Sequence, residues 1–463
     1  MTTERHGIRL PSRRTFLLLV GLSALIYLLV FSLPYPLSQH YNQIPPVDYA
    51  KLSNYSLVGF VSYLVGLATL FILYLWALRL IMPKNGETAR AVIGLRFVLV
   101  TGAALAAVLW LSYPLGAIDV FVYAVYTRGW ALYGLNPLAT APAQYPASDP
   151  WLGLAAEWID APSPYGPVWQ VLSLGAYYAG GGDFLRQVFA LKISAIVAYL
   201  GCTILIYRLL QQIRSDWALA GTIAFAWNPL VLIEVAQNAH NDIVMIFFML
   251  AAVWALTTPP RKHSPLVYDG LVCLFLALSV LTKFITIVVV PFFLLVLLSR
   301  GQRWPDRFAR LLGFGSLLGA LLVLGTWPLW PGWDTWAVVQ GADAAGRSIL
   351  ALLVLTLRDV FTLSSAFDVA RQVLLGLYVV IYGYAVWRVF KIIWHSKEDR
   401  SEALIQQTFA SAFSALFWLL LLVMPIFHAW YLVWCFPLAV LLLPQRRLLQ
   451  AAIVFSITAL FII

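Results

Sequence analysis

The chain has 463 residues, of which 62% are hydrophobic and 11% are charged, with a mean hydropathy of +0.85 and a formal net charge of +10. Soluble globular proteins contain about 25% charged residues, so this composition excludes a soluble enzyme and indicates a polytopic membrane protein.

Long apolar runs recur along the whole chain. A transmembrane helix needs about 20 mostly apolar residues to cross a hydrocarbon core of roughly 30 Å. The sequence predicts an all-α transmembrane helix bundle of about 13 spans, which cover residues 14–32, 55–78, 94–114, 188–208, 217–234, 241–257, 267–282, 284–299, 308–326, 370–391, 404–423, 428–443 and 448–463.

The first run follows Arg13 and Arg14 and resembles a signal peptide, but it lacks a small-residue cleavage site and is long enough to span. We therefore expect a retained helix with a cytoplasmic N-terminus. With that orientation most of the 30 lysines and arginines fall in inner loops, as the positive-inside rule requires. The net charge is then explained by topology, and no nucleic-acid partner is expected.

Segment 115–187 is the longest polar segment and is assigned to the outer face. It is too long for a simple connector and rich in aromatic residues, so we expect it to fold on the membrane surface with juxtamembrane helices. If 167–180 crossed the membrane, every later loop would change sides and the basic loops would lie outside. This piece is therefore expected to lie at the outer face. The predicted domains are an N-terminal transmembrane hairpin, 1–93, and a larger transmembrane domain, 94–463, that carries this outer segment.

Asp119 lies just beyond the outer end of a predicted span, in "AIDVFVYAVYTRGW", where Arg128 is the first evident charge partner. Acids at the membrane edge are costly and point to function. Six polar residues follow later in "EVAQNAHND", 234–242, between two apolar runs. An ordinary turn needs two or three polar residues, so this outer hairpin is also a candidate site.

Two further outer junctions carry a cation or a titratable ring. Lys283 lies between two spans in "LTKFIT", and His428 follows Pro425 in "MPIFHAWY". The structural alternatives are that Lys283 snorkels to the interface and that His428 caps a helix. Arg128 and Arg347 are further outer cations.

The sequence carries no signal for redox, zinc or nucleotide chemistry. Cys202, Cys273 and Cys435 all fall in predicted spans and are interpreted as small buried apolar residues. The sequence contains no zinc-type Cys/His spacing and no Walker or GxGxxG loop, so an ATP-driven pump or a soluble nucleotide-sugar enzyme is not expected.

The order of these motifs resembles the GT-C superfamily of integral-membrane glycosyltransferases. The motifs are "AIDVFVYAVYTRGWALYGLNPL", "SPYGPVW", "NPLVLIEVAQNAHNDIVMIFFMLAA", "LTKFITIVVVPFF" and the stretch beginning "FHAWYLVWCFPLA". They cover roughly residues 95–445 and are most similar to polyprenyl-phosphate-mannose-dependent mannosyltransferases. Two spans precede the one that leads to Asp119, and a single Asp stands where many relatives have an acidic pair, which leaves dependence on a divalent metal open.

The resemblance implies a cell-membrane glycosyltransferase that moves a hexose, with mannose favoured, from polyprenyl phosphate to a glycolipid or glycan acceptor. Transfer would occur on the non-cytoplasmic face with inversion, without a cofactor, and membrane lipids would be its other partners. Asp119 fits the general base, and Lys283, His428, Arg128 and Arg347 fit binding of the leaving phosphate. The expected sugar- or acceptor-binding residues are Tyr123, Tyr165, Glu234, Asn238, His240, Asn241, Asp242, Trp430 and Tyr431.

The main alternative is a transporter or flippase of a lipid-linked sugar or a small polar solute. Alternating access would need polar groups that continue toward the inner face, whereas 284–299 and 428–443 become almost purely apolar in that direction. The sequence leaves open which sugar is moved, the acceptor and the linkage position.

Overall fold

A computed structural model describes residues 12–42, 56–83, 92–258, 264–332, 346–395, 401–442 and 446–461. Several predicted inner loops fall partly outside these ranges. Within them the chain forms helices and turns, with two isolated β-bridges and no β-strand. The prediction of an all-α polytopic bundle is confirmed.

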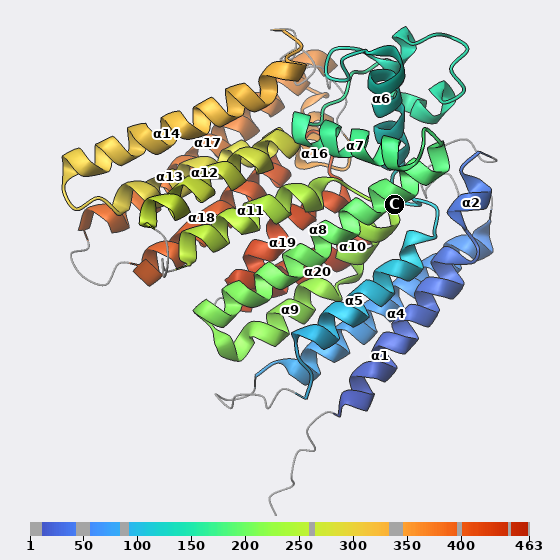
Figure 1. The fold of residues 1–463 in the computed structure, drawn as a ribbon, viewed down its shortest axis with the longest axis horizontal. Helices are drawn as coiled ribbons and strands as arrows, with labels where there is room; N and C mark the ends of the chain where they lie inside the picture. Colours follow the sequence, from blue (N-terminus) through green and yellow to red (C-terminus); the bar gives the residue numbers. More distant parts are fainter. Residues whose placement is uncertain are drawn as a thin grey trace, which may run out of the picture.

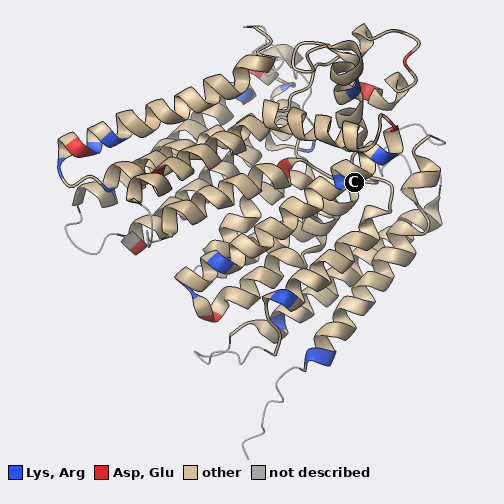
Figure 2. Ribbon diagram, in the orientation of Figure 1, with Lys and Arg blue, Asp and Glu red and all other residues tan. Residues whose placement is uncertain are grey.

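Seven helices are long and apolar enough to cross a membrane. They comprise α1 (Arg13–Ile26) continued by the π-helix η1 (Tyr27–Ser32), α4 (Leu57–Ile81), α8 (Phe184–Ile213), α12 (Pro265–Thr282), α14 (Trp304–Thr326) continued by η7 (Trp327–Leu329), α17 (Leu363–His395) and α18 (Ser401–Leu422). The bundle carries its charged residues mainly near its ends, with few along its length (Figure 2).

The other predicted spans correspond to shorter or broken helices. They are α5 (Leu95–Trp110), α9 (Ala218–Ala226) with α10 (Pro229–Leu232), α11 (Asp242–Thr257), η6 (Phe284–Val289) with α13 (Val290–Ser299), η8 (Ala429–Tyr431) with α19 (Leu432–Leu441), and α20 (Arg446–Leu460). Counting the bent pair as one span raises the candidate number to 8. A total of thirteen crossings therefore stays a prediction.

The predicted continuous span 217–234 is wrong in one respect, because the helix is broken. After the 3₁₀ turn η4 (Ser215–Trp217), α9 stops before Pro229, which has no N–H and cannot continue a helix. The Asn228 side chain accepts hydrogen bonds from the Leu230 and Val231 N–H groups and starts α10, at a bend of 51°. The π-helix η5 (Ile233–Gln237) follows and leads into the polar hairpin.

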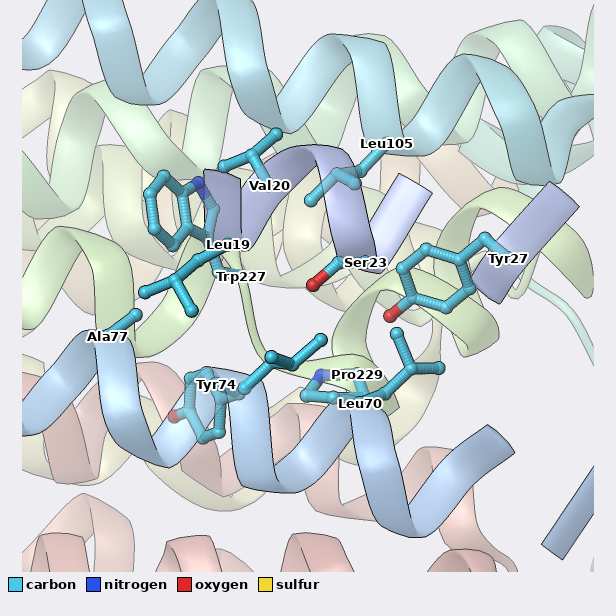
Figure 3. Close-up of a pocket in the computed structure, with 11 residues that line it drawn as sticks. Leu19, Val20, Ser23, Tyr27, Leu70, Tyr74, Ala77, Leu105, Trp227 and Pro229 are labelled. Atoms are coloured by element: carbon cyan, nitrogen blue, oxygen red, sulfur yellow. The ribbon is translucent and has the colours of Figure 1, made fainter. Parts of the chain in front are cut away.

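The N-terminal helix α1 packs against both α4 and α5 (Figure 1). The cavity between them and the α9–α10 break is lined mainly by apolar side chains from α1, α4 and α5 (Figure 3). Its volume of about 10 Å³ holds at most one water molecule, so it is a packing gap and no ligand site. The proposed domain boundary at residue 93 stays a prediction.

Segment 115–187 folds into short helices that gather at one end of the bundle (Figure 1). They are α6 (Asp119–Tyr133), η2 (Pro142–Gln144), η3 (Leu152–Trp158) and α7 (Pro167–Ala179), of which α7 packs on α6 and α8. The short helices α2 (Leu37–His40) and α16 (Ile349–Leu357) were not predicted. None of these six belongs to the candidate spans of the described chain.

The opposite end of the bundle is held by a buried acid between two arginines. Asp269, near the start of α12, is fully buried and pairs with Arg300, which ends α13. Arg310 Nη1 of α14 lies 2.8 Å from the second carboxylate oxygen. Because each charge has a partner, these helix ends can pack closely in apolar surroundings.

The arrangement of helices predicts the accessibility of introduced cysteines. In a variant that lacks the three native cysteines, Ser148→Cys and Tyr178→Cys should react with an impermeant thiol reagent from outside intact cells, because both are exposed at the α6–α7 end. Gln211→Cys, exposed near the end of α8, should react only after permeabilisation. Labelling at 178 only after permeabilisation would mean that α7 crosses the membrane.

Candidate active site

The polar hairpin, residues 233–242, is shaped by an unusual backbone. The wide π-turn of η5 is followed by Ala239 in the left-handed region, with φ of 58°. The His240 N–H then donates to the Glu234 carbonyl at 3.0 Å, and Asn238 Nδ2 donates to Glu234 Oε2 at 2.8 Å. These bonds close the hairpin, so α11 begins with Asp242 at its first residue.

The hairpin is joined to the loop that carries Asp119. The Gly116 N–H donates to Asn238 Oδ1 at 3.2 Å, and a Cβ at position 116 would lie 2.6 Å from Asn238 Nδ2. A side chain at position 116 would therefore displace the Asn238 amide from this contact. Glu234 and Asn238 were predicted to bind sugar, but their side chains hold the two loops together. Asn238 bonds to Gly116, and Glu234 bonds to Asn238.

Asp119 is the first residue of α6 and is nearly buried, with 9% of its surface exposed. Tyr165 Oη donates a hydrogen bond to Asp119 Oδ1 at 2.6 Å. Tyr165 is placed by Gly166, whose N–H donates to the Thr282 carbonyl at 3.1 Å and whose Cβ, if present, would lie 2.1 Å from the Leu281 carbonyl oxygen. The "SPYGPVW" motif thus brings Tyr165 to the end of α12 and fixes one carboxylate oxygen of Asp119.

Lys283 follows directly at the end of α12. Its Nζ lies 2.7 Å from Asp242 Oδ1, and the same oxygen accepts a hydrogen bond from Trp434 Nε1. The rings of Tyr165, Tyr431 and Trp434 surround the ammonium with centroids 5.3 to 5.7 Å from Nζ. Tyr165 therefore contacts both the Asp119 carboxylate and the Lys283 cation.

Trp430 is stacked between two histidines. Its ring centroid lies 4.2 Å from that of His240 and 4.1 Å from that of His428, with an interplanar angle of 17° in both pairs. Both faces of the indole are therefore covered, and only its edge remains for a ligand. Tyr431 lies beside His428 at 5.3 Å and stacks obliquely on Trp434.

The pKa values of the two histidines are shifted in opposite directions. Burial opposes protonation of His240, but the Glu234 carboxylate, 3.2 Å from Nε2, and the charges of Asp119 and Asp242 outweigh it and raise its pKa. Burial lowers the pKa of His428 to about 4, and Lys283 and Arg347 contribute to the decrease. At neutral pH His428 is therefore an uncharged hydrogen-bonding group, and its expected role as a phosphate cation is weakened.

The predicted arginines lie at the edge of this arrangement. Arg128 is nine residues beyond Asp119 on α6, roughly 14 Å along the axis. Its Nε lies 2.7 Å from Asp149 Oδ2, and its guanidinium stacks over Trp151 at 4.5 Å, so it supports the outer segment. Arg347 is exposed, with φ of 51°, beside the Gly346–Pro425 backbone contact that leads toward His428.

A group of buried polar atoms in the hairpin has no hydrogen-bond partner among the described residues. It includes both amide atoms of Gln237 and of Asn241, as well as Asp242 Oδ2 and His240 Nδ1. Buried polar groups in proteins are nearly always paired, so these atoms indicate a partner from outside the chain, either water or a ligand. Tyr123, a turn beyond Asp119, packs its ring 4.8 Å from Tyr165.

The sequence analysis gave no role to three buried residues with polar groups, namely Gln237, Trp434 and Lys192. Gln237 was noted in the hairpin but given no role, and Trp434 follows Trp430 and Tyr431 at helical spacing, which could have predicted a shared face. Lys192 of α8 is fully buried, and its Nζ donates to the Ser112 carbonyl at 2.6 Å. It caps the end of α5 and has a structural role.

No cluster of three or more His, Cys, Asp or Glu side chains suited to a metal ion occurs in the described ranges. Dependence on a divalent metal stays open, as the sequence left it. The site as a whole combines two carboxylates, Asp119 and Asp242, that each have an oxygen without a hydrogen bond in the described ranges, with one caged cation and a set of unpaired amides. Such a set suits acid–base chemistry beside an anionic group.

Comparison with known families identifies the chain. Residues 18–299, more than half of its length, match the MptA_B family, described as alpha-(1->6)-mannopyranosyltransferase, N-terminal domain. The chain belongs to this family, and the resemblance to GT-C-type membrane mannosyltransferases is confirmed. The matched range includes both N-terminal helices, the Asp119 loop, the polar hairpin and Lys283. No curated protein sequence matches the chain.

The charge state of His428 predicts a pH effect on stability. Its pKa of about 4 lies below the usual value near 6.5, so the unfolded state binds more protons between these limits and the folded state loses stability as pH falls from 6.5 to 4. The melting temperature of the purified protein should fall across this range, and the fall should be smaller in His428→Gln. Equal slopes for both proteins would show that His428 is not held neutral.

Proposed function

Because the chain is a mannosyltransferase of this family, we propose that it transfers mannose from a polyprenyl phosphate to a glycolipid or glycan on the non-cytoplasmic face, forming an α-(1→6) bond. One observation carries the proposal: Asp119 keeps one carboxylate oxygen on Tyr165 and the other available, while the same tyrosine ring lies against Lys283. A base and a cation for phosphate are therefore neighbours. Family membership favours this enzyme over the transporter alternative.

Asp119 serves as the general base in the proposed reaction. The acceptor hydroxyl oxygen attacks the anomeric carbon as its proton passes to the free oxygen of Asp119. The bond between the anomeric carbon and the phosphate oxygen breaks, and polyprenyl phosphate leaves with the electron pair. Direct attack inverts the anomeric centre, so an α product requires a β-linked donor.

Lys283 stabilises the charge that develops on the leaving phosphate. Its ammonium has three N–H donors, of which one is used by Asp242 Oδ1, and the aromatic rings exclude water around it. His428, being neutral, would donate a single hydrogen bond. Arg347 lies at the exposed edge near His428, where it could attract the anionic donor before it is seated.

The unpaired amides of Gln237 and Asn241 are suited to sugar hydroxyls, because each offers a donor and an acceptor at fixed positions. His240 can contribute Nδ1, and Trp430 can contribute only its edge. The polyprenyl tail would lie among the membrane lipids that surround the apolar helices. No nucleotide is required for such a transfer.

A direct assay tests this function. Purified protein in detergent is incubated with radiolabelled mannose on polyprenyl phosphate and with a lipid extract or a short α-mannan as the acceptor. We expect radiolabel in an α-(1→6)-linked product and release of polyprenyl phosphate. Absence of transfer to either acceptor, from protein that is folded, would contradict the proposal.

Replacement of Asp119 tests the base. Asp119→Asn keeps the shape and the contact with Tyr165 but removes the basic oxygen, so turnover should fall by about 10² to 10⁴ while donor affinity changes little. Asp160→Asn, an exposed acid of the same outer segment, is the matched control and should keep its activity. More than about a tenth of wild-type turnover in Asp119→Asn would remove the base from this residue.

Replacement of Lys283 tests the leaving-group cation. Lys283→Met keeps the apolar stem and removes the charge, so turnover at saturating donor should fall by about tenfold or more. Arg186→Met, which removes an exposed cation near the start of α8, is the control and should have little effect. If both variants turn over like the wild type, Lys283 has only a structural role.

A further inference from the structure

Trp434 contacts both members of the Lys283–Asp242 ion pair, each in a different way. It lies in the first turn of α19 and is 1% exposed. Its Nε1–H donates to Asp242 Oδ1, and its ring centroid lies 5.3 Å from Lys283 Nζ. Neither the sequence motifs nor the family description gives this residue a role.

We propose that Trp434 is a positioning residue that fixes Asp242, and through Asp242 the ammonium of Lys283, for the leaving phosphate. The inference rests on the proposed function for the identity of that phosphate. Asp242 Oδ1 accepts from both Trp434 and Lys283, whereas Oδ2 has no partner among the described residues. The indole N–H therefore selects which oxygen faces Lys283 and prevents the carboxylate from rotating.

Tryptophan suits this position because its N–H is only a donor and its ring is an apolar plate. A second cation in its place would compete with Lys283 for Asp242, and a purely apolar ring would leave the carboxylate free to turn. Trp434 is buried, and its side-chain hydrogen bond goes to Asp242; no hydrogen bond joins it to Asp119 among the described residues. Its effect should therefore reach the reaction through Lys283 alone.

The test compares Trp434→Phe with Trp227→Phe. Trp227 is a matched control, because it is also buried and its Nε1–H donates to a side-chain oxygen, Thr101 Oγ1, at 3.2 Å, but it lies at the α9–α10 break. The first measurement is the rate at which a small amine-acylating reagent modifies Lys283 in the purified full-length protein, followed by mass spectrometry. The second is the kinetics of mannose transfer.

Loss of the N–H should loosen Asp242, so that the carboxylate holds the Lys283 amine less tightly and leaves it more open to the reagent. Trp434→Phe should therefore increase Lys283 acylation by at least about threefold and lower kcat/KM by about tenfold, while Trp227→Phe changes neither by more than about twofold. In a Lys283→Met background, Trp434→Phe should add less than about a twofold further loss, because residues that act through one group are not additive.

The possible results separate this inference from the proposed function. Unchanged acylation in Trp434→Phe, or an undiminished loss of activity in the Lys283→Met background, overturns the role of Trp434. If the wild type transfers no mannose, the acylation rate still decides whether Trp434 holds the ion pair. If Trp434→Phe does not fold, 3-benzothienylalanine at position 434 keeps the bicyclic shape, removes only the N–H, and should give the same increase in acylation.

Discussion

The ion pair of Lys283 and Asp242 is the contact around which the site is built. Lys283 ends α12, Asp242 begins α11, and Trp434, which donates to the same carboxylate oxygen, belongs to α19. Removing one member of a buried pair leaves an uncompensated charge, at a cost of about 3–5 kcal/mol. Two consecutive helices and a third from much later in the sequence are thus held in one register by a single carboxylate.

Close backbone approaches bring the remaining groups to this pair. Gly166 lies against the carbonyl at the end of α12 and delivers Tyr165, while Gly116 lies against Asn238 and ties the Asp119 loop to the hairpin. A side chain at 166 would clash with backbone, and a side chain at 116 would displace the Asn238 amide. The broken span α9–α10 makes the third contribution. Its bend and the π-turn after it direct the polar hairpin toward the Lys283–Asp242 pair.

Aromatic rings separate and surround the titratable groups of the site. Trp430 separates a histidine whose pKa is raised by carboxylates from one whose pKa is lowered by burial. Three rings around Lys283 exclude water while their faces still favour the cation. The site thus places one caged cation, Lys283, in the same region as a histidine that burial holds neutral.

The sequence by itself determined the class of protein, the positions of the apolar segments and the candidate residues Asp119, Lys283 and the polar hairpin. Hydrophobic runs of fixed length and charges at membrane edges are local signals, so they can be recognised without a structure. Which of these residues touch was decided only by tertiary structure. The pairing of Asp119 with Tyr165, 46 positions away, and of Asp242 with Trp434, 192 positions away, depends on glycine contacts and a helix break that set the distances between helices, and no local pattern encodes such distances.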